Sequence, residues 1–370
     1  MKILYVTTIS LTMNSFFKPH IEMLVKDGNT VDIACNYNNL EIDSLYDELG
    51  CKSWQIDFSR SPLSLNNLKA YRQLKKVIEQ GNYDVVHCHT PNASVITRLV
   101  CRKFRKQNKL KVFYTAHGFH FYKGAPKVNW LLFYPIEKIC SRFTDKLITI
   151  NQEDFELAKN KFKAREVCYI PGVGIDLPRF KDILVNRTNK RQEIDVPEDA
   201  FLLLSIGELN GNKNHQIIIK ALSELNNPNV YYAIAGVGEK KDYLLRLANK
   251  LGVSNRIRLL GYRKDANELY HCADVFCFPT IREGLGLAAI EAMACGIPVV
   301  AADNRGTRTF VSQGVNGFLC SIGSIQDFTT AIKTLIDDSF LKISMSEECK
   351  NTAEEFSLDN ILIELKKIYY

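Results

Sequence analysis

DVFCFPTIREGLGLAAIEAMACG, residues 274–296, contains a short apolar strand, a polar loop and a helical pattern in immediate succession. Its glycines predict a helix that begins near Gly284 and ends before Gly296, because glycine commonly stops a helix at its C-terminal end. Glu283 would then lie just outside this helix, and Glu291 would lie two turns inside it, roughly 10 Å along the axis. A strand–loop–helix unit of this kind is typical of parallel sheets covered by helices.

The same alternation of apolar strands and helical patterns extends over the rest of the chain. Strands are predicted at residues 2–8, 30–35, 83–89, 111–117 and 146–150, and again at 201–209, 230–236, 256–261, 274–279 and 297–302. Helices are predicted at residues 64–80, 92–106, 128–143 and 151–163. Because the pattern restarts after residue 200 and 370 residues exceed one average core, we predict an α/β protein with two doubly wound, Rossmann-like domains. Ligands bind beyond the carboxyl ends of such strands, so two domains with facing strand ends would enclose a cleft.

The expected domain boundaries follow from composition. We place the N-terminal domain at residues 1–176 and the C-terminal domain at residues 201–356. The segment between them, 177–200, is polar and has little periodicity, which indicates a linker. Residues 357–370 have the pattern of an amphipathic helix with Ser357 at its N-cap.

The composition is that of an ordinary globular enzyme, with 46% hydrophobic and 24% charged residues. No apolar run reaches the roughly 18–20 residues that span a bilayer. The N-terminus MKILYVTTIS lacks the pattern of a signal peptide, so we expect a cytoplasmic protein. The eleven cysteines are odd in number and include no C-x-x-C, which favours reduced thiols.

The net charge of +7 is unevenly distributed. Residues 1–180 contain 26 Lys and Arg against 17 Asp and Glu, whereas residues 181–370 contain 22 against 24. Within residues 60–111 there are 12 basic and 2 acidic residues. A solvated basic face and attraction to an anionic membrane surface both remain open, since each Lys or Arg near a membrane contributes up to about 1 kcal/mol. Nucleic acid is disfavoured as a partner, because no binding motif accompanies the charge.

The loop before the predicted 284–296 helix has the chemistry of a nucleotide-sugar site. A helix N-terminus offers free N–H groups and partial positive charge to a phosphate, and Gly284 and Gly286 let a ligand approach the backbone. Glu283 would accept hydrogen bonds from sugar hydroxyls, and Glu291 would accept both hydroxyls of a vicinal diol such as ribose. The spacing alone leaves open an ordinary N-terminal acid and an exposed glutamate.

Two other loops that follow predicted strands carry candidate residues. In SIGELNGNKNH (205–215), Lys213 would open the next helix and face a phosphate, although Glu208 places an acid beside it. In YTAHGFHFYKGAP (114–126), His117 would hydrogen-bond a sugar hydroxyl and His120 would line the same pocket. A solvated lysine and structurally satisfied histidines are the plainer alternatives.

Two patterns are weaker than they first seem. In VVHCHTP (85–91), His87 and His89 point to one side of a strand, but no further ligand set accompanies them, and we predict no metal site. In AIAGVGEKK (233–241), Gly236 and Gly238 lack the third glycine of a dinucleotide fingerprint. They predict instead a close approach of the backbone to a ligand or a neighbouring segment.

Taken together, these segments resemble family 4 of the retaining glycosyltransferases, which have the GT-B fold. EGLGLAAIE (283–291) resembles the E-x7-E motif of that family. The resemblance extends, in the expected order, through TAHGFHFYKGAP, IPGVGID, SIGELNGNKNH, AGVGEK, LGYRKD and the continuous stretch from the strand before Glu283 to about residue 319. It covers nearly the whole chain, and it points to bacterial enzymes that build capsular, exopolysaccharide or lipid-linked glycans, commonly from UDP-N-acetylhexosamines.

The resemblance implies a role for each matched residue. Glu283 would contact the donor sugar near the reacting centre, Glu291 the ribose hydroxyls and Lys213 the leaving diphosphate. His117 would approach the donor sugar from the N-terminal domain, so that Glu283, His117 and Lys213 are the expected catalytic residues. The C-terminal helix would pack back on the N-terminal domain. The implied donor-binding set is Gly207, Glu208, Lys213, Gly236, Gly261, Tyr262, Arg263, Glu283, Gly284, Leu285, Gly286, Leu287 and Glu291, and the acceptor-side set is Asn14, Ser15, His89, His120 and Lys123.

The sequence departs from the family pattern at two places. Many members have an arginine where this chain has Glu208, which leaves Lys213 and the helix N-terminus as the main phosphate partners. Arg282 and Arg305 are the candidates to compensate. The first loop, TTISLTMNSFFKPH (7–20), has no glycine pair, so the acceptor contacts of that loop cannot be carried over.

From the resemblance we expect transfer of a hexosyl group, in particular an N-acetylhexosaminyl group, from a UDP-sugar to a polyprenyl-diphosphate-linked glycan with retention of configuration. No metal or other cofactor is expected, because Lys213 and helix N–H groups would take the place of the metal. The expected location is the inner face of the plasma membrane, peripherally bound through the basic N-terminal domain. The alternatives are a catalytically silent subunit, suggested by Glu208, and a nicotinamide-dependent oxidoreductase, which lacks its fingerprint.

Overall fold

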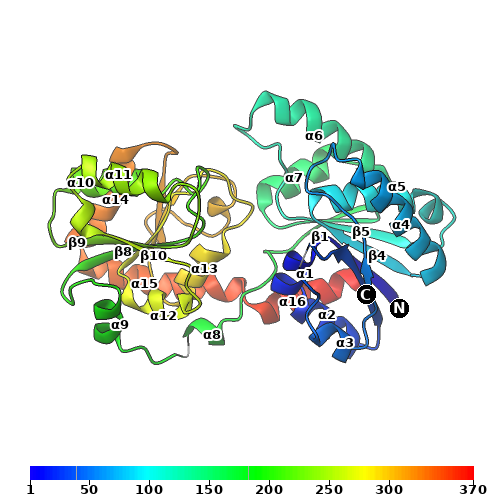
Figure 1. The fold of residues 1–370 in the computed structure, drawn as a ribbon, viewed down its shortest axis with the longest axis horizontal. Helices are drawn as coiled ribbons and strands as arrows, with labels where there is room; N and C mark the ends of the chain where they lie inside the picture. The colour runs from blue at the N-terminus through cyan, green and yellow to red at the C-terminus, as the bar shows by residue number, and fades with distance from the viewer. Residues whose placement is uncertain (39, 182) are drawn as a thin grey trace. The chain divides into compact units, whose positions relative to one another are not determined.

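The computed structural model describes residues 1–38, 40–181 and 183–370, which form two compact units (Figure 1). Unit 1 comprises residues 1–173 and 361–370, and unit 2 comprises residues 174–360. Each unit has a parallel sheet covered by helices on both faces, which confirms the predicted α/β class with two doubly wound halves.

Unit 1 contains a seven-stranded sheet in the order β3-β2-β1-β4-β5-β6-β7. Its strands are β1 (Lys2–Ile9), β2 (Thr30–Asn36), β3 (Ser53–Gln55), β4 (Val85–His89), β5 (Lys111–Ala116), β6 (Lys146–Thr149) and β7 (Glu166–Tyr169). Its helices are α1 (Ser10–Phe16), α2 (Lys18–Lys26), α3 (Leu45–Glu48), α4 (Asn66–Gly81), α5 (Pro91–Lys106), α6 (Lys127–Cys140), η1 (Ser141–Phe143) and α7 (Gln152–Lys161). The last helix, α16 (Leu358–Tyr369), belongs to this unit from residue 361 onward.

The two faces of the unit 1 sheet are made by alternate residues of the central strands. Leu4 and Cys88 pack into the hydrophobic core beneath α4 and α5. Tyr5, His87 and His89 point to the opposite face, where α1, α2 and α16 lie (Figure 1). The α16 helix is held there by Tyr369, whose hydroxyl lies 2.5 Å from His87 Nδ1. The sequence order changes direction at β1 and β4, which is where doubly wound sheets bind ligands.

Unit 2 contains a six-stranded sheet in the order β10-β9-β8-β11-β12-β13. Its strands are β8 (Phe201–Ile206), β9 (Val230–Ala235), β10 (Ile257–Gly261), β11 (Val275–Phe278), β12 (Val299–Ala302) and β13 (Gly317–Cys320). Its helices are α8 (Pro178–Lys181), α9 (Arg187–Glu193), α10 (Gln216–Leu225), α11 (Lys241–Lys250), η2 (Ser254–Arg256), α12 (Ala266–Cys272), α13 (Leu287–Ala294), η3 (Thr307–Thr309), α14 (Ile325–Asp337) and α15 (Ser339–Glu355).

The segment 177–200 differs from the linker that its composition suggests. Its described residues belong to unit 2 and include α8 and α9. Arg191 is 1% exposed, donates to the carbonyls of Cys272 and Ala200, and pairs with Asp274 at 2.8 Å. A buried arginine of this kind is satisfied by main-chain oxygens, so a segment that is polar in sequence can still be part of a packed unit.

The strands absent from the sequence prediction lie at sheet edges. β3 and β7 are the two edges of the unit 1 sheet, and β13 is one edge of the unit 2 sheet. They have only three or four residues each and lack the long apolar runs of central parallel strands.

None of the helices in the described part of the chain is long and apolar enough to span a membrane.

Candidate functional site

The E-x7-E segment contains a loop followed by a helix that starts later than predicted. β11 ends at Phe278 and α13 begins at Leu287, not near Gly284. Gly286 precedes α13 at φ +113, and a Cβ there would lie 2.8 Å from the Phe278 ring, so the chain turns tightly at this point. Glu283 therefore lies four residues before the helix and Glu291 little more than one turn inside it. The expected distance of roughly 10 Å along a single helix axis does not apply.

The structure brings two of the three predicted catalytic residues together in unit 2. Lys213 Nζ lies 2.9 Å from Glu283 Oε2, and both side chains are about a quarter exposed, at 24% and 23%. The same ammonium lies 5.2 Å from the centre of the Phe278 ring. A cation is thus held next to the start of the 279–286 loop, paired with an acid that a ligand could replace.

Backbone and amide contacts fix this pair by joining the 207–215 loop to the 279–286 loop. The Asn212 side chain accepts from Arg282 N–H at 3.1 Å and donates to the Arg282 carbonyl at 3.0 Å. Ile281 N–H donates to the Asn212 carbonyl at 2.8 Å. Asn210 accepts from Lys213 N–H at 2.9 Å. The asparagines of ELNGNKN therefore have a structural role that the sequence prediction missed.

The ion pair that the structure shows for Lys213 is with Glu283, and Glu208 makes a different contact. Its exposed carboxylate accepts a hydrogen bond from the Asn210 side chain at 3.0 Å. Of the two arginines expected to compensate, Arg305 is 6% exposed and its Nε lies 3.4 Å from the Glu283 carbonyl, beneath the loop. Arg282 is exposed. The Arg305 guanidinium thus lies at hydrogen-bond distance from the Glu283 backbone.

The predicted donor glycines lie at the ends of neighbouring strands. A Cβ at Gly236 would lie 1.9 Å from the Gly207 carbonyl oxygen, and Gly236 N–H donates to the Gly261 carbonyl at 2.7 Å. Gly236 thus allows two segments of the protein to approach, which is one of the two alternatives that the sequence left open. Tyr262 is 73% exposed beside this edge. Arg263 is bound to Asp265, with its Nε at 2.7 Å, and to Glu193.

Glu291 is held in α13 by a buried tyrosine. Tyr270 donates from its hydroxyl to Glu291 Oε2 at 2.8 Å. Burial raises the pKa of the Glu291 carboxyl, while the Tyr270 hydrogen bond and the charge of Arg179 oppose that shift. The Tyr270 hydrogen bond thus fixes one carboxylate oxygen of Glu291. Leu285 is buried, whereas Gly284 and Leu287 are only partly covered.

The third predicted catalytic residue, His117, lies in unit 1 at the end of β5. Its Nε2 is 3.2 Å from Nδ1 of His89, at the end of β4. Burial, together with the charge of nearby His20, lowers the pKa of His117 to about 4, and burial lowers that of His89 well below its usual value. Both rings are therefore neutral near pH 7. His87 is bonded to Thr115 Oγ1 at 2.8 Å and to Tyr369, so His87 has a structural role.

The remaining acceptor-side candidates do not all come together. His120 packs against the Phe133 ring at 4.9 Å and lines two adjoining pockets of unit 1. Asn14 is used to hold the neighbouring segment, donating to the Glu41 carbonyl at 2.9 Å. Ser15 and Lys123 are exposed and line neither of those pockets. The sequence prediction missed Arg60, Asn92 and Glu137, which do line these pockets.

No group of three or more His, Cys, Asp or Glu side chains within the described ranges is arranged to hold a metal ion.

Comparisons with known proteins match both units of the chain. Residues 2–151 match the family described as Glycosyl transferase 4-like, and residues 186–356 match Glycosyl transferases group 1. A Bacillus subtilis (strain 168) protein with the name "Putative glycosyltransferase EpsD" is 38% identical over 372 residues, covering 100% of this chain and 96% of EpsD. An Escherichia coli protein named UDP-Gal:alpha-D-GlcNAc-diphosphoundecaprenol alpha-1,3-galactosyltransferase is 26% identical and covers 94% of this chain and 90% of its own length.

Solved structures show the same fold. Anabaena Alr3699/HepE in complex with UDP superposes with a TM-score of 0.80 at 22% identity, covering 100% of this chain and 99% of that one. WaaG, described as a glycosyltransferase involved in lipopolysaccharide biosynthesis, has a TM-score of 0.74 at 17% identity, covering 99% of each chain. The family matches, the full-length relative and the two doubly wound units all point to the same family and fold. The chain is a glycosyltransferase of family 4 with the GT-B fold.

Proposed function

We propose that the protein is a retaining transferase that moves an N-acetylhexosaminyl group from a UDP-sugar to a polyprenyl-diphosphate-linked glycan. The observation that carries the proposal is the pair of Lys213 and Glu283 at 2.9 Å beside the loop that leads into α13. This is a site with one exchangeable cation, one sugar-binding acid and a helix N-terminus, which is the set that a diphosphate-linked sugar needs.

Lys213 is proposed to bind the diphosphate of the donor. A diphosphate carries more negative charge than Glu283, so it would draw the ammonium away from the carboxylate when the donor binds. Glu283 would then accept a hydrogen bond from a hydroxyl of the donor sugar. As the bond to the sugar breaks, negative charge grows on the leaving diphosphate, and Lys213 with the N–H groups at the start of α13 would stabilise it.

Glu291 is proposed to bind the ribose. Tyr270 fixes Oε2 of this carboxylate at 2.8 Å, so the side chain is already oriented before the ligand arrives. Its other oxygen is then placed to accept from a ribose hydroxyl. For His117, the proposed role is a hydrogen bond from its neutral ring to a sugar hydroxyl.

The comparisons support the proposed donor and acceptor without identifying them. Alr3699/HepE has been solved with UDP and with UDP-glucose. Two relatives are named for transfer to diphosphoundecaprenol-linked sugars, one of galactose from UDP-Gal and one, from Campylobacter jejuni, of N-acetylgalactosamine. The relatives are named as transferases, so the alternative of a catalytically silent subunit gains no support from them.

The proposed reaction requires no metal or other cofactor, because Lys213 and the α13 N–H groups would carry the charge of the diphosphate. The proposed location is the inner face of the plasma membrane, with unit 1 bound peripherally to anionic lipid. The support for this location is the excess of positive charge in residues 1–180.

A transfer assay tests the proposal. The purified chain is incubated with an undecaprenyl-diphosphate-linked GlcNAc acceptor and, in parallel, with UDP-GlcNAc, UDP-GalNAc, UDP-glucose or UDP-galactose. We expect transfer from a UDP-N-acetylhexosamine, with an α-linkage in the product by proton NMR. A β-linked product would contradict retention, and transfer only from a UDP-hexose would contradict the N-acetylhexosaminyl assignment.

A further inference from the structure

Two adjoining pockets of unit 1 differ in part of their lining. The first, here called the polar pocket, is lined by Thr8, Thr12, Thr90 and Arg60, among others. The second, here called the apolar pocket, has a volume of about 190 Å³ and lies between α5 and α6. Both are lined by the same five residues, so they are neighbouring parts of one hollow: Pro62, Pro91, Asn92, His120 and Phe133.

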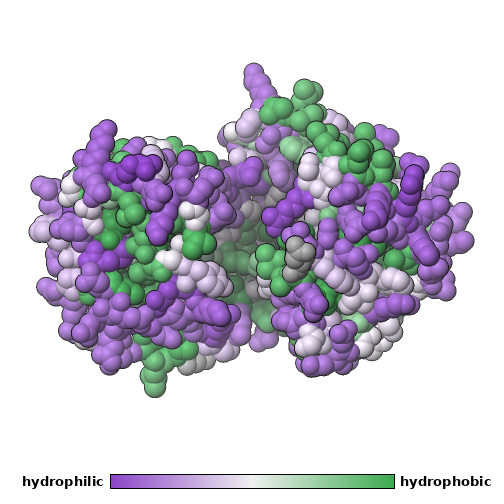
Figure 2. Space-filling view, in the orientation of Figure 1, coloured by the Kyte–Doolittle hydropathy of each residue, from purple (hydrophilic) through white to green (hydrophobic). Residues whose placement is uncertain are grey.

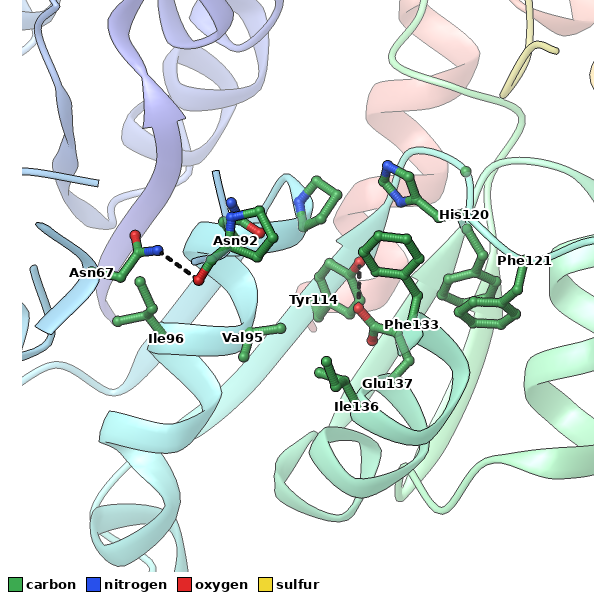
Figure 3. Close-up of a pocket in the computed structure, with 14 residues that line it drawn as sticks. Asn67, Asn92, Val95, Ile96, Tyr114, His120, Phe121, Phe133, Ile136 and Glu137 are labelled. Atoms are coloured by element: carbon green, nitrogen blue, oxygen red, sulfur yellow. Dashed lines mark hydrogen bonds between the residues drawn. The ribbon is translucent and has the colours of Figure 1, made fainter. Parts of the chain in front are cut away.

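The apolar pocket is lined mainly by hydrophobic side chains, with a few polar residues among them. Its walls are mostly hydrophobic and come from two helices and the loop after β5, as Figure 3 shows: Val95, Ile96, Phe119, Phe121, Phe133 and Ile136. The one carboxylate that lines it, Glu137, is already paired with the fully buried Arg98 at 2.8 Å. Tyr114 also donates to Glu137, at 3.5 Å. Because these charged groups satisfy one another, burial of apolar surface is the main gain available to a ligand.

The polar pocket is suited to an anion. Its three threonines lie at the ends of β1 and β4 and in α1, where a doubly wound sheet binds its ligands, and the hydroxyls of Thr8 and Thr90 are bonded to each other at 2.7 Å. The exposed Arg60 guanidinium is not paired with a carboxylate of the described residues. Asn92 donates to the Arg60 carbonyl at 2.6 Å, which fixes the backbone of this arginine at the rim. Arg60 therefore offers an exposed guanidinium, on a fixed backbone, to a phosphate group.

An exposed hydrophobic rim continues outward from the apolar pocket. Ile136 lines the pocket and is also 43% exposed, so pocket and surface are continuous. On the same helix Leu131 and Leu132 are 74% and 54% exposed, and Figure 2 shows hydrophobic residues on the surface over α6.

On the other side of the pocket, next to Pro62 and Asn67, Leu63 is 92% and Leu68 is 64% exposed. Contiguous exposed apolar side chains of this kind mark an interaction site.

We propose that this hollow binds the lipid end of the acceptor. The diphosphate would lie at Arg60 in the polar pocket, and the isoprene units next to it would lie in the apolar pocket. The rest of the polyprenyl chain of the acceptor would pass over the rim formed by α6 and residues 63–68 into the bilayer. The apolar pocket is smaller than the roughly 300–1,000 Å³ of sites that hold a whole ligand, which fits a short segment of a longer chain. The inference rests on the proposed function, since it specifies how a polyprenyl-diphosphate acceptor would be recognised.

Binding of farnesyl diphosphate, compared with inorganic diphosphate, tests this site without any need for catalysis. The full chain should bind farnesyl diphosphate about tenfold or more tightly, because only that probe fills the apolar pocket. In the Ile136→Gln variant, the affinity for farnesyl diphosphate should fall while that for inorganic diphosphate stays the same. The matched control is Ile363→Gln, at an isoleucine of unit 1 that is 53% exposed on α16 and should change neither affinity.

The outcomes separate this inference from the proposed function. Equal affinity of the wild-type chain for the two probes would overturn the lipid site, even if UDP-sugar transfer is observed. Preferential binding of farnesyl diphosphate that Ile136→Gln leaves unchanged would also overturn it, because the isoprene units would then lie elsewhere. If the lipid site is correct and transfer is observed, Ile136→Gln should raise KM for the lipid-linked acceptor and leave UDP affinity unchanged. Unchanged melting temperatures for both variants would show that folding is not the cause.

Discussion

The ion pair between Lys213 and Glu283 joins two residues that are 70 positions apart in sequence. The sequence predicted both residues, each from its own loop, but it could not predict their contact. That contact depends on how Asn212 binds the backbone of Arg282, a detail with no signature in composition or spacing. At the scale of single residues, the sequence could thus predict that Lys213 and Glu283 belong to the candidate site. It could not predict that these two residues form an ion pair.

Replacing Glu283 should affect turnover far more than nucleotide binding. In Glu283→Gln we expect kcat to fall about a hundredfold, because a sugar held out of position by a lost contact reacts slowly. UDP affinity should stay the same or rise, since Lys213 is released from its acid. Steady-state kinetics and UDP calorimetry measure the two effects. Loss of UDP binding with normal turnover at saturation would contradict the role assigned to Glu283.

The raised pKa of Glu291 predicts a pH dependence of ribose binding. The carboxylate is the form that accepts from a diol, so binding is complete above its pKa and declines as pH falls through it. Because burial raises that pKa, the decline should begin at a higher pH than for an ordinary glutamate. Uridine is the probe, because it carries the ribose and no phosphate that titrates.

Calorimetry with uridine over a falling pH series measures this effect. Glu291→Gln should bind uridine weakly and lose the pH-dependent step, whereas the control Glu208→Gln should keep it. A pH dependence that survives in Glu291→Gln would assign the step to another group.

The loop before α13 shows what the sequence could and could not indicate about elements. The existence of the strand, loop and helix was predictable from apolar periodicity and glycines. The predicted helix start, near Gly284, is wrong by three residues, because the tight turn before the helix is made at Gly286, against the Phe278 ring. The short edge strands could not be predicted from the sequence for a similar reason. Their own residues carry little signal, and they are strands because they pair with a neighbouring strand.

Substitution at Gly286 should perturb both the fold and the site. In Gly286→Ala, the left-handed backbone costs about 1–2 kcal/mol of unfolding free energy, and the added Cβ also displaces the Phe278 ring. Since that ring lies under Lys213, UDP affinity should fall as well. Gly314→Ala is the matched control, because Gly314 has φ +74 with no heavy atom within 4 Å of an added Cβ.

Chemical denaturation and UDP titration of both variants check this expectation. Gly314→Ala should lose only the backbone contribution to unfolding free energy and keep its UDP affinity. Equal losses of stability in the two variants would show that the Phe278 contact is unimportant.

At the scale of the whole molecule, charge and exposed hydrophobic surface coincide in one part of the chain. Residues 1–180 have a net charge of 26 − 17 = +9, and residues 181–370 have 22 − 24 = −2. The exposed leucines of α6 lie in the positive part. The sequence showed the charge asymmetry directly, but the apolar pocket and its rim required the fold, since they combine residues from α4, α5, α6, β5 and the loops before α4 and after β5.

This combination predicts salt-sensitive binding to anionic vesicles. The chain should sediment with phosphatidylglycerol vesicles at low salt and much less with neutral vesicles, and added salt should weaken the binding by screening. The double variant Leu131→Gln/Leu132→Gln should bind less at every salt concentration, whereas Ile322→Gln, at a 48% exposed position of unit 2, should not. Absence of sedimentation at low salt would remove the support for a peripheral membrane location.

The most direct test of the account is thermal unfolding of the purified chain with UDP, GDP, ADP and NAD in parallel. A ligand at about 100 times its Kd stabilises the folded state by about 2.7 kcal/mol, enough to raise Tm by a few degrees. We expect Tm to rise with UDP alone, and to rise less in Glu291→Gln. A rise with GDP or ADP instead would keep the fold and change the donor. No rise with UDP at saturating concentration would contradict the central claim that unit 2 is a UDP-sugar site.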